Sequence, residues 1–329
     1  EIAIWNDSVD TLRSDPTFTI DANHKITLYQ PNSTPTDRST YNIGGGNVAN
    51  VTGNYNTGFG KDNLNSVTTG SGNSAFGKQA GNKITTGNSN VAIGDTSLYN
   101  TTIASNNIAI GVQSLYYNTD GGINIAVGYQ SMFNNLSGNY NIALGSNALL
   151  SNTTGSRNVA IGSQAVEGNT SGSFNIGIGE TALKQNTTAS YQIAIGANSL
   201  YLNNGGYNTA IGYEALRFNT SGVQNTSIGY QSMRLSTIGD VNTAIGYGSG
   251  GSLTTGSYNV LIGGGNAITT GSSNVVIGRD SGSSIATLSN RIIISDGDGN
   301  IRQYIDNVGN VGIGTDSPST RIDISSELS

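Results

Sequence analysis

The sequence has no cysteine, a single histidine (His24), four prolines and only 10% charged residues. No disulfide can form, and one imidazole cannot build a Ser-His-Asp triad, a Cys-His pair or a zinc site in the repeated part of the chain. The net charge of −6 offers no basic stripe for phosphates, so we expect no nucleic-acid partner. No apolar run approaches the roughly 18 residues that cross a bilayer, so we expect no membrane insertion. We therefore expect no enzyme, catalytic residue, metal or cofactor.

What the sequence does contain is one unit repeated about every 17 residues. The unit reads Asn, a β-branched residue, Ala, Ile, Gly, two variable positions, Ser or Ala, and Leu, and a polar stretch rich in Asn, Thr and Gly follows. Its first residue is Asn, or Gln at 192, at positions 42, 56, 73, 90, 107, 124, 141, 158, 175, 192, 208, 225, 242, 259, 274 and 290. Such a period is typical of a solenoid, in which each coil buries its apolar residues only by stacking on its neighbours. The apolar register argues against a disordered Gly-rich chain.

Each unit predicts one coil. In the unit that begins at Asn107, we expect a strand over Ile108–Ile110, a bend at Gly111, a second strand around Ser114–Tyr116 and a return loop over Asn118–Gly122. Equivalent strands of successive coils should pair in parallel and in register, about 4.8 Å apart. The predicted fold is an all-β parallel β-solenoid, or β-roll, of about fifteen 17-residue coils with β-hairpin caps.

The strand of each unit predicts the oligomeric state. Along Val91–Gly94 and Ile142–Gly145 both faces are apolar and uncharged, and such strands are buried on both faces. One face can pack inside its own coil against the Leu column, but a coil this short has no second layer for the other face. We expect a homo-oligomer, most simply a homotrimer with these strands innermost and the small Ala and Gly residues allowing close approach around the axis. The alternative is a monomeric solenoid filled by its own side chains.

Columns of Asn and Tyr run through the array. The leading Asn residues and a second Asn column are expected to form hydrogen-bonded amide ladders along the solenoid. Aromatic faces pack on sugars, so the Tyr residues that follow the bend glycine are candidate glycan-stacking residues. The alternative, which we favour, is that these rings stack coil on coil and shield strand edges. The candidates are Tyr129, Tyr213, Tyr230 and Tyr247.

The two ends differ from the array. We divide the chain into an N-terminal β cap or lead-in module (1–41), the repeat array (42–294), and a C-terminal β-hairpin with an extended tail (295–329). In the first segment, Phe18–Ile20 and Lys25–Tyr29 indicate a hairpin. In the last, Asp296–Asn300 superficially resembles a Ca²⁺ loop, but its twelfth residue is Asn307 instead of Glu, so we expect a hairpin turn.

Three segments resemble known families. The Asn-x-Ala-Ile-Gly-x-x-Ser/Ala-Leu repeat over 42–294 resembles the head repeats of YadA-like trimeric autotransporter adhesins, which implies a trimeric left-handed parallel β-roll that binds host surfaces. The opening, Ile2–Asn6 with Phe18–Asp21, looks like a lead-in module of phage tail fibres. Gly309–Pro318 is similar to the segment before an endosialidase-type intramolecular chaperone. In that family the chaperone trimerises the fibre and cuts itself off after a serine, so Ser329 is the expected mature C-terminus after cleavage.

An autotransporter would also need a coiled-coil stalk and a membrane barrel, and this sequence contains a pattern for neither. We therefore expect a phage or phage-like fibre. The resemblance implies an extracellular virion tail fibre that binds a host cell-surface glycan or protein receptor and joins other tail or baseplate proteins through its N-terminal side. The alternatives are a purely structural spacer, a bacterial trimeric adhesin head and an ice-binding solenoid. A row of Thr pairs favours the last, but breaks at Asp120 and Asn204 argue against a flat ice-binding face.

Overall fold

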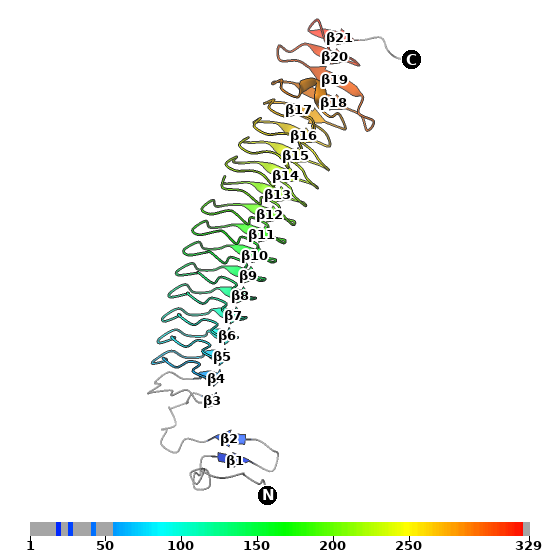
Figure 1. Cartoon of the computed structure of the whole chain (residues 1–329). Helices are drawn as coiled ribbons and strands as arrows, with labels where there is room; N and C mark the ends of the chain where they lie inside the picture. The colour runs from blue at the N-terminus through cyan, green and yellow to red at the C-terminus, as the bar shows by residue number, and fades with distance from the viewer. Residues whose placement is uncertain (1–17, 21–25, 29–40, 44–54, 325–329) are drawn as a thin grey trace.

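The protein is a long β-solenoid. A computed structural model describes residues 18–20, 26–28, 41–43 and 55–324, and its strands stack one above another along a rod (Figure 1). The described residues form strands and turns together with one 3₁₀ turn, η1 (Ser283–Ile285). They include no helix with the length and apolar character of a bilayer span.

Fourteen strands of three residues each, β4 to β17, supply one strand per coil. Each pairs in parallel and in register with the strand of the next coil, as Val91 does with Ile108. Most partners are 17 residues apart, and the spacing falls to 16 between β12 and β13 and to 15 between β16 and β17. The predicted parallel solenoid is confirmed, with fourteen such coils. The bounds are Thr57–Phe59 (β4), Ser74–Phe76 (β5), Val91–Ile93 (β6), Ile108–Ile110 (β7), Ile125–Val127 (β8), Ile142–Leu144 (β9), Val159–Ile161 (β10), Ile176–Ile178 (β11), Ile193–Ile195 (β12), Thr209–Ile211 (β13), Thr226–Ile228 (β14), Thr243–Ile245 (β15), Val260–Ile262 (β16) and Val275–Ile277 (β17).

Each coil contains one strand, where two were predicted. In the coil that begins at Asn107, Ser114–Tyr116 lies in a turn, with φ of 59° at Gln113 and 49° at Leu115. Left-handed residues two positions apart curve the backbone too sharply for a strand. The Leu115 N–H nevertheless donates to the carbonyl oxygen of Ser131 at 3.0 Å, so the turns hydrogen-bond coil to coil as strands do.

The bend after each strand requires glycine for two reasons. Gly94 has a φ of 127°, a conformation that side chains disfavour. A β-carbon at this residue would also lie 2.6 Å from the carbonyl oxygen of Gly111 in the next coil. Backbone conformation and the close approach of successive coils therefore explain the glycine of the repeat together.

The core is a narrow column inside the coils. The middle residue of each strand and the Leu or Met of the following turn are buried, as Ala160 and Leu149 are. A β-carbon on Gly177 would come within 2.5 Å of Cγ2 of Val166, in the turn of the preceding coil, which places the middle strand position in the interior of the solenoid. The prediction that the Ala and Gly residues face a neighbouring chain is therefore wrong. Alternation along the strand points the first and third residues outward instead.

The register corrects the two ends of the array. Asn42, in β3 (Tyr41–Ile43), pairs with Gly58 and thus occupies a middle strand position, so it is not equivalent to Asn56. At the other end, the N–H of Arg291 donates to Oδ1 of Asn274 at 3.0 Å. Arg291, one residue after the predicted Asn290, therefore takes the last leading position.

The predicted hairpins are present. At the N-terminal side, β1 (Phe18–Ile20) and β2 (Ile26–Leu28) pair antiparallel. The turn between these strands and the segment Ile2–Asn6, which resembles a phage fibre module, lie outside the described residues. At the other end, β18 (Ile292–Ser295) continues the parallel stack from β17 and pairs antiparallel with β19 (Ile301–Ile305).

The hairpin turn between β18 and β19 is organised by one carboxylate. Asp296 accepts hydrogen bonds from the backbone N–H groups of Asp298 and Asn300, at 3.0 and 2.9 Å, and pairs with Arg302. The amide of Asn300, together with these backbone donors and Arg302, lowers the pKa of Asp296 to about 2. The chain then continues through β20 (Val311–Ile313) and β21 (Ile322–Ile324), where an extended tail was predicted.

Candidate functional site

An apolar row runs along the outside of the strands. The third residue of most strands is between 36% and 40% exposed, and the first residue is half-buried. Across the described strands β4 to β17, neither position carries a charged side chain. We call this row of first and third residues the outer strand face. Five first positions carry Thr or Ser, and the remaining first positions and all third positions are apolar. A long, mostly apolar surface of this kind marks an interaction site more often than scattered exposed residues do. Its third-position members in that exposure range are Phe59, Phe76, Ile93, Ile110, Ile161, Ile195, Ile245, Ile262, Ile277 and Ile294.

The leading Asn residues close each coil and join it to the next. The backbone N–H of Asn107 donates to Oδ1 of Asn90 at 3.0 Å, and Nδ2 of Asn107 donates to the carbonyl oxygen of Gly121 at 3.0 Å. Gln192 replaces Asn where the following coil has 16 residues, and its Nε2 reaches the carbonyl oxygen of Gly205 at 2.5 Å. The predicted structural role of this column is confirmed.

The second Asn column forms a ladder of side-chain amides. Nδ2 of Asn135 donates to Oδ1 of Asn118 at 2.7 Å and to the carbonyl oxygen of Gly138 at 3.1 Å. The same pattern continues to Asn152 and Asn169. All of these side chains are buried, so they lie beneath the surface instead of offering amides to a ligand.

Three of the four candidate tyrosines stack on one another. The ring centroids of Tyr213 and Tyr230 lie 5.4 Å apart, and those of Tyr230 and Tyr247 lie 5.1 Å apart, with nearly parallel planes. The facing surfaces of these rings are therefore occupied by each other, as the coil-on-coil alternative predicts. Tyr129 is 52% exposed and stands in a different part of the array. A sugar-stacking role for the four remains a prediction, and Ser329 lies outside the described residues.

Other aromatic rows also stack along the rod. Tyr99, Tyr116 and Phe133 follow one another with centroids 5.2 Å apart. The guanidinium of Arg157 lies between two rings, 5.4 Å from the centroid of Tyr140 and 5.2 Å from that of Phe174. These contacts reinforce coil-to-coil stacking on the flanks.

The Thr row serves the same purpose. Oγ1 of Thr85 donates to the carbonyl oxygen of Thr102 at 3.1 Å, and Oγ1 of Thr153 donates to that of Thr170 at 2.9 Å. Hydroxyl donors in this row are thus used between coils.

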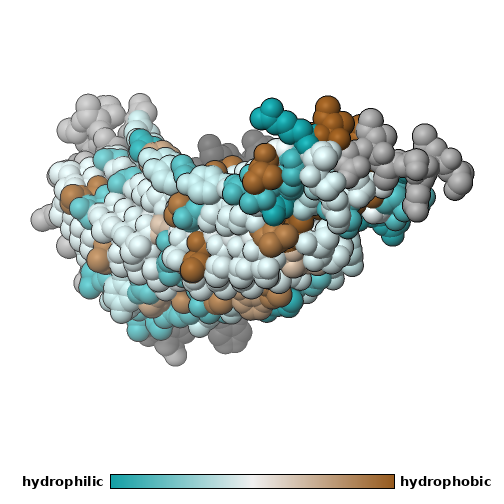
Figure 2. Space-filling view, turned by 90° about the horizontal axis from the view of Figure 1, so that it is seen from above, coloured by the Kyte–Doolittle hydropathy of each residue, from teal (hydrophilic) through white to brown (hydrophobic). Residues whose placement is uncertain are grey.

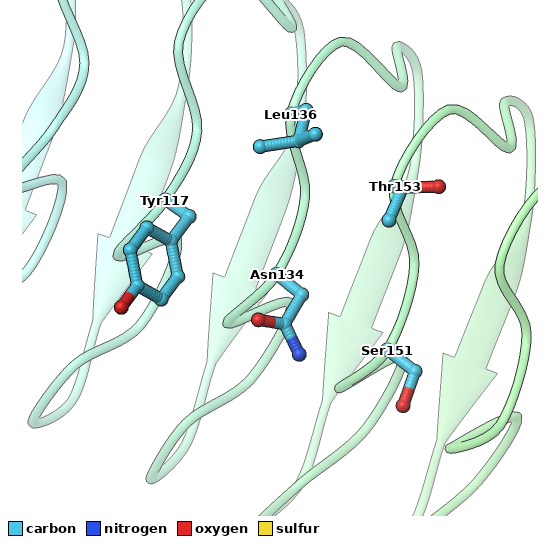
Figure 3. A pocket seen from close by; sticks show the side chains of 5 residues that line it. All are labelled: Tyr117, Asn134, Leu136, Ser151 and Thr153. Atoms are coloured by element: carbon cyan, nitrogen blue, oxygen red, sulfur yellow. The ribbon is translucent and has the colours of Figure 1, made fainter.

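One flank of the rod is hollowed. Two adjoining hollows, of about 410 and 470 Å³, share Ser151 in their walls. Figure 3 shows the first, with Tyr117, Asn134 and Ser151 on one side and Leu136 and Thr153 on the other. We call the two together the flank groove. The second is lined by Ser151, Glu167, Gly168, Lys184, Gln185, Thr187 and Asn204.

The walls of the flank groove hold polar groups without partners. The side chains of Asn134, Ser151 and Gln185 make no hydrogen bond within residues 55–324, where their backbone N–H groups all bond to the next coil. Nζ of Lys184 lies 3.2 Å from Oε2 of Glu167, an oxygen that receives no hydrogen bond from the described residues. This groove was not predicted from the sequence. The side chains at one repeat position become smaller from Tyr117 through Asn134 and Ser151 to Gly168, and this trend could have indicated it.

A buried ion pair lies farther along the rod. Glu214 is 5% exposed, accepts from Nε of Arg234 at 2.6 Å and from Nε2 of Gln231 at 2.8 Å, and pairs with Arg217 at 2.5 Å. Burial alone raises the pKa of Glu214, but the hydrogen bonds from Gln231 and Arg234 and the charges of both arginines outweigh it and hold that pKa below its ordinary value.

Comparisons of the chain with protein-family models, with characterised proteins and with solved structures gave no match. The class of protein is therefore assigned from the fold alone. The chain is a β-solenoid repeat protein of fourteen coils, with a mostly apolar row on its strands and a hollow on one flank.

Proposed function

We propose that the chain forms a homotrimeric, extracellular fibre of a phage or phage-like particle, and that the fibre attaches to a glycan on the host cell surface. The outer strand face carries this proposal. Most of its third-position residues leave more than a third of their surface uncovered, and no charged side chain interrupts the row from β4 to β17. Contact between this row and another copy of the chain would remove a long, ordered apolar surface from water.

Repetition favours parallel copies around one axis. Copies in the same direction and at the same height bring identical residues together at every coil, for example Ile161 with Ile161. Three copies let each outer strand face contact both others, which agrees with the trimeric, left-handed β-roll that the YadA-like resemblance implies. Ile and Val side chains of the outer strand face would then line the axis, while the Ala residues stay inside each coil.

Attachment is supported by the rest of the surface. In the view of Figure 2 most of the surface is pale or teal, and hydrophobic residues form separate brown patches. A polar rod with a hollow flank suits contact with a hydrated cell surface. The resemblance of the opening segment to phage fibre modules further favours a particle in which other tail or baseplate proteins hold the N-terminal side.

A binding assay tests the attachment. The labelled full-length chain should bind to cells of a susceptible host and to one or more glycans on an array. A complete blank on both would favour the purely structural spacer, whose receptor-binding tip lies elsewhere. Portal and baseplate genes beside the gene would favour the phage fibre over a bacterial adhesin head.

A further inference from the structure

The geometry points to the flank groove as the glycan-binding site, with an extended chain of neutral sugars lying along the rod as its ligand. This inference rests on the proposed function and specifies where and what the fibre binds. It replaces the stacked row Tyr213–Tyr247, whose facing ring surfaces are taken by each other.

The free polar groups of the groove match sugar hydroxyls. A hydroxyl both donates and accepts, and the amides of Asn134 and Gln185 offer a donor and an acceptor each. The hydroxyl of Ser151, between them along the rod, adds another such group. Oε2 of Glu167 is covered and stays paired with Nζ of Lys184 at 3.2 Å, so the amides and the hydroxyl carry the polar contacts. Asn134 and Ser151 are half-buried and Gln185 is exposed, so a ligand in the groove can reach all three side chains.

The apolar part of the groove matches the carbon–hydrogen faces of sugar rings. Tyr117 and Leu136 are each 43% exposed at one end of the flank groove. Tyr117 packs edge to face between Tyr116 and Phe133, with centroids 4.8 and 5.0 Å away, so its ring is held in place. A fixed, half-exposed aromatic ring beside free amides is a surface on which a sugar can stack while its hydroxyls stay hydrogen-bonded.

The charge of the groove selects a neutral ligand. Glu167 and Lys184 are the charged residues in the lining, and they lie against each other. Their charges cancel, so the flank groove offers neither a cationic patch for uronic or sialic acids nor an anionic one for amino sugars.

The repeat of the rod fits a polymer. Successive coils rise by about 4.8 Å, the spacing of paired strands, which is close to the length of one sugar unit in an extended glycan. Wall residues at the same coil position, such as Asn134 and Ser151, therefore recur once for each sugar. Longer glycans should contact more coils and bind more tightly.

An extended peptide is a poorer occupant. Peptides add to a free strand edge through their backbones. In the flank groove, the N–H of Ser151 donates to the carbonyl of Glu167 and that of Gln185 to the carbonyl of Tyr201, so these donors are already used between coils.

Filling the groove tests the assignment. Ser151→Tyr places a ring in the hollow. Tyr117 occupies the equivalent position two coils earlier, so the rod already accepts a tyrosine at this coil position. Ser252→Tyr makes the same change at that coil position outside the groove and is the matched control. Gln185→Ala removes an exposed amide without adding bulk. Its glycan binding therefore still tests the groove if Ser151→Tyr folds poorly.

Full-length wild-type chain and the three variants are applied to an array of neutral linear oligosaccharides, from monosaccharides to octasaccharides, and of uronic-acid polymers. We expect wild-type binding to neutral glycans that strengthens with length, a loss of at least about tenfold for Ser151→Tyr and a smaller loss for Gln185→Ala. Ser252→Tyr should bind as wild type does. Equal binding by all four proteins overturns the groove but leaves glycan attachment standing, as does a preference for the uronic-acid polymers. No binding by wild type to any glycan overturns both.

Discussion

Nδ2 of Asn152 donates a hydrogen bond to Oδ1 of Asn135, one coil earlier, across 2.7 Å. The same nitrogen donates to the carbonyl oxygen of Gly155 at 3.0 Å, and Oδ1 of Asn152 accepts from Asn169 at 2.8 Å. Each amide of this ladder therefore bonds both to its own coil and to its neighbours. Because the ladder is buried, these bonds have no competition from water.

Asn152→Asp should destabilise the rod by roughly 2 to 4 kcal/mol per chain. A carboxylate has no donor, and it would face two acceptors, Oδ1 of Asn135 and the carbonyl oxygen of Gly155. Denaturant unfolding followed by circular dichroism measures the change. Asn134→Asp, at a half-buried amide without side-chain hydrogen bonds, is the control and should stay within about 0.5 kcal/mol of wild type. Equal stabilities for the two variants would contradict the ladder.

The contact between Val166 and Gly177 predicts a coupled pair. Gly177→Ala alone puts a β-carbon 2.5 Å from Cγ2 of Val166, so we expect a cost of about 1 to 3 kcal/mol from overpacking. Adding Val166→Leu recreates the pair that Leu149 and Ala160 form one coil earlier, and should recover most of the loss. A double-mutant cycle on unfolding free energies measures the coupling. Strictly additive effects would show that the two positions do not share the core in this way.

The ion pair at Glu214 predicts a loss of stability in acid. A folded-state pKa below the ordinary value means that its contribution is fully present above about pH 4.3 and disappears as the pH falls through the folded-state pKa. The melting temperature of wild type should therefore drop more between neutral pH and about pH 3 than that of Glu214→Gln, which cannot titrate there. The difference should amount to about 1 to 3 kcal/mol of unfolding free energy. Parallel melting curves across this range would remove the ion pair from the account.

Much of the fold could be predicted from the sequence because every repeat has the same apolar, Asn and Gly positions and therefore forms the same coil. The spacing of the leading Asn residues predicted the register that pairs Val91 with Ile108, and the bend glycines marked the ends of the strands. The second strand was wrong because the left-handed turn at Leu115 is filled by an ordinary residue with no sequence signal for positive φ. Leucine rarely adopts this conformation, and here it is held by the coil-to-coil hydrogen bond of its N–H and by the burial of its side chain in the core.

The faces of the coil were harder to predict than its register. Val-Ala-Ile is apolar on both sides, so the pattern could not tell which side points inward, and the Ala column was assigned to the wrong one. The second Asn column was placed in the return loop, as for Asn118, and the two hydrogen bonds of Asn152 show that this column lies in the interior. The flank groove arises from side chains of different coils brought together at one position, Asn134 beside Ser151 for example, and a periodic pattern hides such departures from the average.

Ile161→Glu tests the role of the outer strand face. In the proposed trimer, this substitution places three carboxylates together in an apolar axis, so assembly should fail while the coils of each chain stay folded. The strand content by circular dichroism reports the fold, and light scattering reports the assembly. Thr154→Glu, an exposed position away from the strands, should assemble as wild type does. Normal assembly of both variants would show that the outer strand face lies outside the interface.

Sedimentation equilibrium of the wild-type chain measures the central feature directly, which is whether the outer strand face is shared between copies. Three chains of 33.8 kDa give 3 × 33.8 kDa, or about 101 kDa, and we predict this mass at micromolar concentrations. A single species of 33.8 kDa would mean that the row from Phe59 to Ile294 stays open to water, and it would contradict the trimeric fibre.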